Sequence, residues 1–207
     1  MFAHASPQVT LSQNNRIVAI VRGTGSPHST KFVGATKYLF TNFAKEREGL
    51  YGGYESYGIT ISGPSSFFGV AYGVAEQFML KESASATRLV AAVGYVSGND
   101  SVTLTLYADN GNNSPGAVLS SGTSATKTEF GACCGVTSVT IPSTSLNAGT
   151  RYWIGITTTG SNFEASMREI SDQVDEYAYA AYTSNGGSTW GAGSLTFGPD
   201  LSAIGIK

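Results

Sequence analysis

Charged side chains are scarce in this 207-residue chain. Asp, Glu, Lys and Arg make up 13% of it, and 12 basic against 14 acidic side chains give a formal net charge of −2. Proteins that bind nucleic acid usually present a basic surface that displaces counterions from phosphates. The sparse, nearly balanced charge therefore argues against a nucleic-acid partner. It also argues against a disordered chain, which typically carries a high net charge.

Long apolar runs are missing as well. The longest run, residues 89–96, is far shorter than the roughly 20 residues that a membrane-spanning helix needs. We therefore expect no membrane span.

Histidine is almost absent. The only two, His4 and His28, lie near the N-terminus, which excludes Ser-His-Asp and Cys-His sites from the rest of the chain. A glycosidase needs only two carboxylates, and an acidic cluster contains Asp172, Asp175 and Glu176. Such clusters are more often solvated loops than catalytic pairs. We predict that the protein is not an enzyme, and a carboxylate-based glycosidase is a third alternative.

The two cysteines, Cys133 and Cys134, are adjacent. Adjacent cysteines cannot join distant parts of a fold, but they can form a vicinal disulfide, pair with another chain or stay reduced. In an oxidising compartment we favour the vicinal disulfide. It could line a ligand surface, although a rigid turn is the commoner use. A zinc site would need further Cys or His ligands, and none is near in the sequence.

Glycine, serine and threonine make up more than a third of the residues, and they alternate with apolar residues or mark turns. This period-two pattern predicts β-strands separated by turn clusters. We expect strands at 58–62, 75–80, 87–96, 101–107, 117–120, 137–141, 150–157, 163–168, 177–183 and 203–206. Residues 87–96 are apolar on both faces, which predicts a strand in the middle of a sheet. The pattern is typical of an all-β, antiparallel β-sandwich of jelly-roll type over residues 38–207.

Residues 1–37 form a predicted N-terminal extension. Ala3 and Ala5 give the first residues the Ala-x-Ala shape of a signal-peptidase site, so residues 1–5 are either a signal-peptide remnant or a chance match. Residues 8–12 and 16–21 alternate like strands, and 23–30 is a Gly/Ser/Pro-rich link. A strand on such a link could join its own sheet or the open edge of a neighbour's. Only residues 38–48 have helical spacing, for one or two turns.

Aromatic side chains in turn-rich segments are candidates for glycan binding, because their flat faces suit sugar C–H groups. The candidates are Trp190, Tyr177, Tyr179 and Tyr182. On a strand Tyr177 and Tyr179 would share one face and Tyr182 would take the other. Burial in the core is the favoured alternative for each of them, and it is also the expected role of Trp153.

One loop offers oxygen ligands of the kind that calcium binds. Asp109, Asn110 and Asn112 are weak candidates for such a site. Their spacing does not fit an EF-hand. We favour the alternative that these side chains cap their own turn through hydrogen bonds to the backbone.

Several stretches, in order, resemble the bacterial extracellular domains called choice-of-anchor R. They are residues 39–43 (LFTNF), 57–63 (YGITISG), 75–78 (AEQF), 104–111 (LTLYADNG) leading to 114–119 (SPGAVL), and 146–154 (LNAGTRYWI). The resemblance implies a jelly-roll sandwich outside the cell, similar in shape to carbohydrate-binding modules. It implies no reaction and supplies no catalytic residues.

These observations predict a secreted, non-catalytic sandwich that binds an extracellular glycan or a cell-surface component. The alternative is a self-assembling structural subunit that forms a homo-oligomer through its N-terminal strand. No cofactor is expected, apart from the weak calcium candidate.

Overall fold

The computed structural model describes residues 8–11, 17–20, 38–41, 54–98, 101–124, 135–162, 164–170, 177–197 and 204–207. The chain divides into two compact units, Met1–Lys37 and Tyr38–Lys207. In the first unit, β1 (Gln8–Leu11) and β2 (Ile17–Ile20) form a two-stranded antiparallel sheet. Both strands were expected from the alternation of the sequence.

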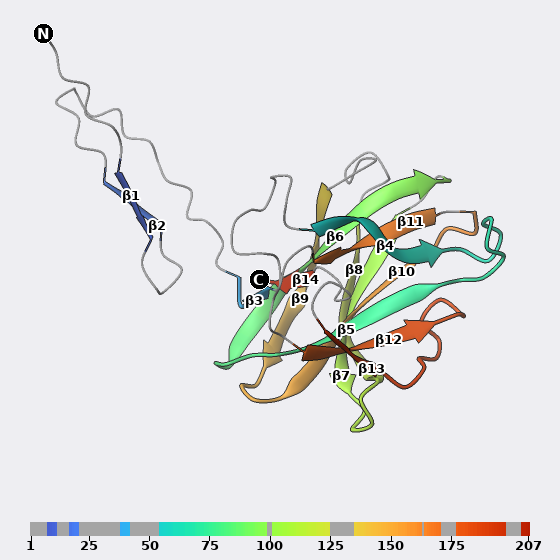
Figure 1. Ribbon diagram of the computed structural model, residues 1–207. Helices are drawn as coiled ribbons and strands as arrows, with labels where there is room; N and C mark the ends of the chain where they lie inside the picture. The colour runs from blue at the N-terminus through green and yellow to red at the C-terminus, as the bar shows by residue number, and fades with distance from the viewer. Residues whose placement is uncertain are drawn as a thin grey trace, which may run out of the picture. The chain divides into compact units, whose positions relative to one another are not determined.

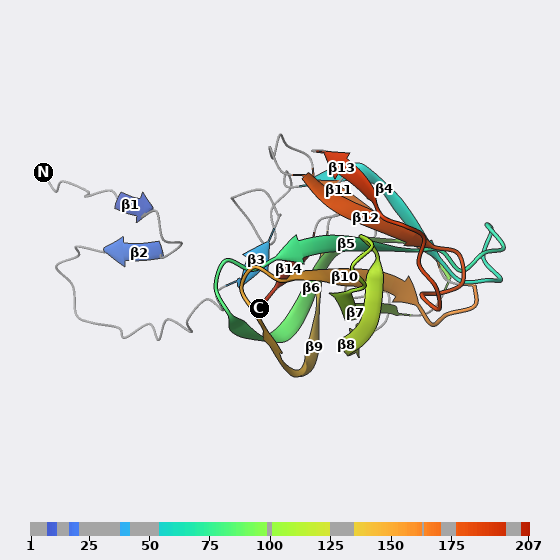
Figure 2. The ribbon, with the colours of Figure 1, turned by 90° about the horizontal axis from the view of Figure 1, so that it is seen from below.

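The second unit contains two antiparallel β-sheets, and its described residues include no helix (Figure 1). The first sheet has the order β13-β12-β5-β10-β7-β8. Its strands are β13 (Ser194–Phe197), β12 (Tyr177–Thr183), β5 (Gly73–Met79), β10 (Arg151–Thr158), β7 (Val102–Asp109) and β8 (Pro115–Thr123). The central strands of this sheet follow one another side by side in Figure 2.

The second sheet is built around β6 (Ala84–Ser97). Along one edge of β6 runs β9 (Gly135–Leu146), and along the other edge β14 (Ile204–Ile206) is followed by β11 (Glu164–Ile170). The outer strands are β3 (Phe40–Thr41), which pairs with β14, and β4 (Tyr54–Ser62), which pairs with β11. The central position predicted for the doubly apolar segment 87–96 is therefore confirmed.

The two sheets enclose one hydrophobic core. Both contribute every second residue along their strands, as the period of a β-strand requires. From β7 and β10 come Leu104, Leu106, Ile154 and Ile156, all fully buried, and Leu89 and Val93 from β6 belong to the same cluster. The predicted all-β antiparallel sandwich is thus confirmed, while its assignment to the jelly-roll type stays a prediction.

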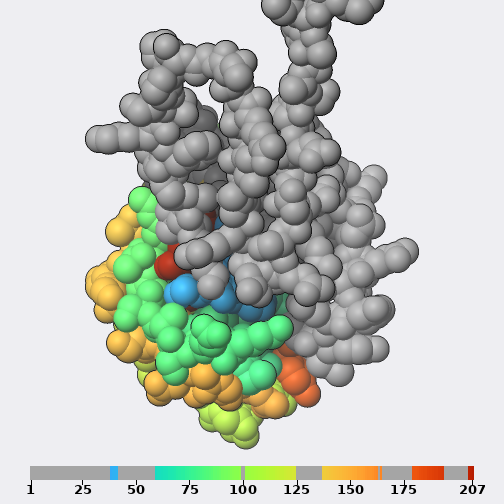
Figure 3. Space-filling model, turned by 90° about the vertical axis from the view of Figure 1, so that its left-hand side faces the viewer, coloured from blue at the N-terminus to red at the C-terminus, as the bar shows by residue number. Residues whose placement is uncertain are grey.

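The helix expected at residues 38–48 is wrong over its described part. Phe40–Thr41 is a strand, because its backbone pairs with β14 and the Phe40 ring packs 5.3 Å from that of Phe78. Tertiary pairing overrides the helical spacing here, as it commonly does in short segments. Figure 3 shows residues 38–41, in blue, next to the red C-terminal residues. Residues 42–48 lie outside the described residues.

Candidate functional site

The outer face of the first sheet carries an aromatic cluster, which we call the tryptophan face. It consists of Ala75, Tyr107, Trp153 and Ala181, with Tyr179 and Trp190 packed against them. Ala75, Tyr107 and Trp153 alternate along β5, β7 and β10 with residues of the main core, so they point away from the second sheet. Trp153 has no exposed surface. This confirms its expected role as a core residue, although its core is separate from the main one.

Residues 184–193 fold back over the tryptophan face. The N–H of Gly187 donates to Thr183 Oγ1 at 3.1 Å, the N–H of Gly193 donates to the Asn113 carbonyl at 2.7 Å, and Ser114 Oγ donates to the Gly191 carbonyl at 3.0 Å. These bonds join the segment to the end of β12 and to the turn between β7 and β8. They hold the cover against the sheet through backbone groups at three points.

Trp190 is part of this cover. Its ring meets Tyr107 edge to face, with centroids 5.7 Å apart and planes at 77°. It also fits over Gly155, where an added Cβ would lie 2.7 Å from the Tyr107 ring and 3.1 Å from the Trp190 ring. Burial raises the pKa of the Tyr107 phenol above its ordinary value of 10.0, and contacts with Thr105 and Trp190 offset part of the rise. Trp190 is therefore half-buried, and much of its ring is engaged in packing.

Side-chain oxygens of two of the three calcium candidates, Asp109 and Asn110, accept hydrogen bonds within the protein. Asp109 Oδ1 accepts the indole N–H of Trp153 at 2.7 Å and the amide of Gln77 at 3.4 Å, and Asp109 Oδ2 accepts the N–H of Gly111 at 3.0 Å. Asn110 Oδ1 accepts the N–H of Asn112 at 2.8 Å. The turn is thus capped by its own side chains, as the favoured alternative predicted. Among the described residues, no three His, Cys, Asp or Glu side chains gather as metal ligands would.

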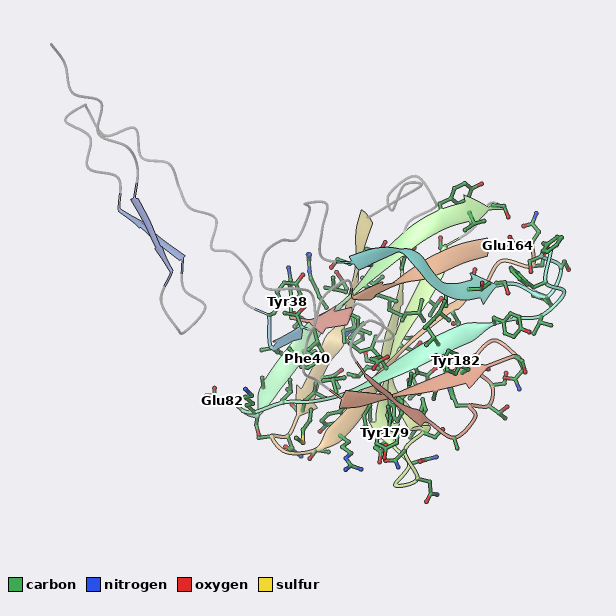
Figure 4. The ribbon with its side chains drawn as sticks, viewed as in Figure 1. Tyr38, Phe40, Glu82, Glu164, Tyr179 and Tyr182 are labelled. Carbon is green, nitrogen blue, oxygen red and sulfur yellow. The ribbon has the colours of Figure 1, made fainter. Side chains whose placement is uncertain are left out.

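The glycan candidates separate onto two faces of β12. Tyr179 lies on the tryptophan face with Trp190, whereas Tyr182 lies on the opposite face of the strand, and its side chain is 45% exposed (Figure 4). The expected alternation of β12 is confirmed for these two residues. The side chain of Tyr177 lies outside the described residues.

A second group of aromatic rings lies at one end of the sandwich, and we call it the aromatic end. It consists of Phe67, Phe68, Tyr72 and Tyr182, which are 91%, 47%, 39% and 45% exposed. They are the exposed aromatic side chains of the described part of the chain. Tyr182 pairs with Val74, two residues from Tyr72, which brings the two segments together.

The loop that carries the two phenylalanines, residues 63–72, is fastened at several points. The Phe67 N–H donates to Glu164 Oε1 at 2.6 Å, and the Ser65 N–H donates to the Ser161 carbonyl at 2.6 Å. Ser62 Oγ donates to the Val70 carbonyl at 2.7 Å. Glu164 is itself buried and also accepts Ser97 Oγ at 3.2 Å (Figure 4). The rings are therefore held in place while they remain exposed to solvent.

A backbone bridge joins this loop to the cover of the tryptophan face. The Gly186 N–H donates to the Ala71 carbonyl at 2.9 Å, and Asn185 lies opposite Ala71. The side chain of Asn185 is held by hydrogen bonds with Thr183 at 2.8 Å and with Thr189 at 2.7 Å. A polar segment rich in hydroxyl and amide groups therefore borders the exposed rings.

Sequence reasoning missed Phe67 and Phe68. The available signal was a pair of adjacent aromatic residues between Pro64-Ser65-Ser66 and Gly69, in a segment that otherwise reads as a turn. The role of Glu164 had no such signal, because it depends on a contact 97 positions away along the chain. Cys133, Cys134 and the acidic cluster of Asp172, Asp175 and Glu176 lie outside the described residues.

The described residues include no helix of the length and apolar character needed to span a membrane. Comparison with protein-family models and with curated proteins finds no match for this chain.

Proposed function

We propose that this protein is a secreted, non-catalytic β-sandwich that attaches to a glycan or another surface component outside the cell. The observation that carries the proposal is the aromatic end. Its rings are exposed, those of Phe67, Phe68 and Tyr72 contact one another, and the loop that carries these three is fastened through Glu164. Large apolar side chains held in water on a rigid loop contribute little to folding, and such patches commonly mark interaction sites. Preorganised aromatic rings bind at a low entropic cost.

The tryptophan face has a supporting role in this proposal. Trp190 and Tyr179 pack against Tyr107 and Trp153, so they stabilise the cover formed by residues 184–193. That cover places Asn185 beside Ala71, at the border of the aromatic end. Of the four candidates predicted from the sequence, Tyr182 is therefore the one that we assign to direct ligand contact. The extracellular location and the resemblance to choice-of-anchor R domains belong to the same proposal.

A glycan array combined with isolated cell walls tests the proposal. We expect fluorescently labelled protein to bind at least one glycan or wall preparation, and the double variant F67A/F68A to lose most of this binding. The matched control is M79A/V118A, which removes two apolar side chains that are 53% and 61% exposed on other parts of the sandwich. Absence of binding to every preparation, or equal binding by both double variants, would contradict the proposal.

A second candidate function is self-assembly through the N-terminal unit. β1 and β2 form a unit of their own and pair only with each other among the described strands. A two-stranded sheet is marginally stable alone, so it would gain by adding to the edge of another sheet. Light scattering during size-exclusion chromatography tests this. Oligomers that disappear when residues 1–30 are removed would support it, and a monomer with and without these residues would rule it out.

A further inference from the structure

The two segments that form the exposed surface of the aromatic end carry no charged side chain, and the nearby Glu164 carboxylate is buried beneath the loop and bonded to Phe67 and Ser97. Residues 63–73 and 182–193 contain no Asp, Glu, Lys, Arg or His, and they offer aromatic rings, hydroxyls and amides instead. Acidic glycans and anionic lipid headgroups are attracted by clusters of Lys and Arg. Neither segment supplies such a cluster. The chemistry of these two segments therefore fits a ligand that is itself uncharged.

The exposed rings do not form a flat platform. Phe67 and Phe68 have ring centroids 5.6 Å apart with planes at 83°, and Phe68 and Tyr72 have centroids 6.2 Å apart with planes at 73°. A flat crystalline surface can lie against several rings only where their faces are coplanar. Here each ring is instead nearly perpendicular to the next, so successive rings face different directions. They suit a ligand whose own rings change orientation along its length. A single polysaccharide chain, whose sugar rings rotate about each linkage, has that property.

Polar groups border these rings, and they favour a sugar over a lipid as the ligand. The Gly186–Ala71 hydrogen bond holds the segment of Asn185, Ser188 and Thr189 beside the loop, and these three side chains are exposed. Burial of these side chains in the hydrocarbon of a lipid would remove their hydrogen bonds to water and provide no others, which is unfavourable. Sugar hydroxyls would instead exchange one set of hydrogen bonds for another. Sites for small ligands typically combine aromatic contact with a few polar groups in this way.

We infer that the aromatic end binds a single chain of an uncharged polysaccharide, with sugar C–H groups against Phe67, Phe68 and Tyr72 and sugar hydroxyls toward the segment of Asn185. The electron-rich faces of aromatic rings attract the weakly positive C–H groups of a sugar. This inference rests on the proposed function, because it names the class of ligand for the same site. It places neither the acidic cluster nor the cysteines in the site.

Affinity electrophoresis tests the inference with defined probes. Native gels would contain soluble uncharged polysaccharides (mixed-linkage β-glucan, galactomannan, arabinoxylan or soluble starch) or acidic ones (polygalacturonate or alginate). Sedimentation with crystalline cellulose and with phosphatidylcholine vesicles completes the set. We expect retardation by at least one uncharged polysaccharide, unchanged at high ionic strength because no charges are screened. F67A/F68A should weaken this binding about tenfold or more, as the loss of aromatic anchors commonly does.

The controls separate folding from binding. Phe67 is almost fully exposed and Phe68 about half exposed, so their replacement should leave the circular dichroism spectrum unchanged and lower the Tm by no more than about 2–4 °C. M79A/V118A should bind like the unaltered protein. Binding through Phe67 and Phe68 to polygalacturonate, crystalline cellulose or vesicles, without binding to any uncharged soluble chain, would overturn the inference and leave the proposed function standing. Failure to bind any of these probes, glycans or cell walls would overturn both.

Discussion

The carboxylate of Asp109 accepts three hydrogen bonds at once, from the Trp153 indole, the Gln77 amide and the Gly111 backbone. The shortest of them, at 2.7 Å, satisfies the only donor of a fully buried indole. A single side chain thus joins the turn after β7 to the centre of the tryptophan face. Its oxygens have a structural task that does not require a cation.

Replacement of Asp109 by Ala should therefore destabilise the protein by about 2–3 kcal/mol, since a buried donor loses a charged acceptor. Urea unfolding followed by tryptophan fluorescence measures the change. The control is Asn112→Ala, whose side chain is exposed and should change the free energy of unfolding by no more than about 0.5 kcal/mol. Calcium or EDTA should leave the Tm unchanged. A calcium-dependent rise in Tm that D109A abolishes would contradict this account.

Tyr107 should make stability sensitive to alkaline pH. Burial raises the pKa of its phenol above the ordinary 10.0, so the folded state holds this proton more tightly than the unfolded state does. The resulting stability is fully present below pH 10.0 and is lost as the pH rises through the higher pKa of the folded state. Comparison of Tyr107→Phe with the unaltered chain isolates this effect, because the other tyrosines are present in both.

The two proteins should therefore differ in the slope of stability against pH above the ordinary tyrosine pKa, with the steeper decline in the unaltered chain. Urea unfolding at several pH values up to about 11 gives these slopes. Parallel declines in the two proteins would show that the Tyr107 phenol ionises as easily in the folded state as in the unfolded one.

The elements of the sandwich were predictable where the sequence pattern is local. Alternation located β7, β10 and β12 to within two residues at each end, and apolar character on both faces placed β6 at the centre of its sheet. Alternation did not reveal β3, because two residues are too few to show a period, and it did not reveal β13 either. Their strand character depends on pairing with segments far away in the sequence.

The candidate site was predictable only in part for the same reason. Local pattern correctly separated Tyr179 from Tyr182 on β12, and it suggested that the asparagine-rich turn caps itself. It could not show that Trp190 packs onto Tyr107, or that Glu164 holds the loop of Phe67. These contacts arise from tertiary structure, and they decide which rings stay exposed.

The loop of residues 63–72 should loosen when its acceptor is removed. Glu164→Ala leaves the Phe67 N–H without its bond at 2.6 Å, whereas Glu164→Gln keeps an oxygen in the same place. We expect about 1–3 kcal/mol of destabilisation for E164A and less for E164Q. Amide hydrogen exchange at Phe67, measured by NMR, should accelerate clearly in E164A. Exchange that is as slow in E164A as in the unaltered protein would show that the other bonds of the loop are sufficient to fix it.

At the scale of the whole molecule, the second unit contains the whole sandwich and both of its aromatic clusters. Every described strand pair of the sandwich and every member of its main core lies within Tyr38–Lys207. The aromatic end and the tryptophan face lie there as well. The first unit contributes one small sheet of its own. Removal of the first unit should therefore affect assembly, if it affects anything, and leave folding and ligand binding intact.

A protein consisting of residues 38–207 should unfold cooperatively, with a Tm within about 2 °C of the full chain. A chain that begins at residue 42 is the matched control, because it also lacks β3. Residues 38–41, which include β3, donate the Leu39 N–H to the Ile206 carbonyl at 2.8 Å and pack Phe40 on Phe78. They also place the Tyr38 ring 4.2 Å from the Lys207 ammonium. Each kcal/mol lost lowers the Tm by roughly 2–4 °C in a domain of this size, so the shorter protein should melt clearly earlier. Calorimetry of the three proteins makes the comparison, and an equally large fall in Tm for both truncated forms would mean that the first unit stabilises the sandwich.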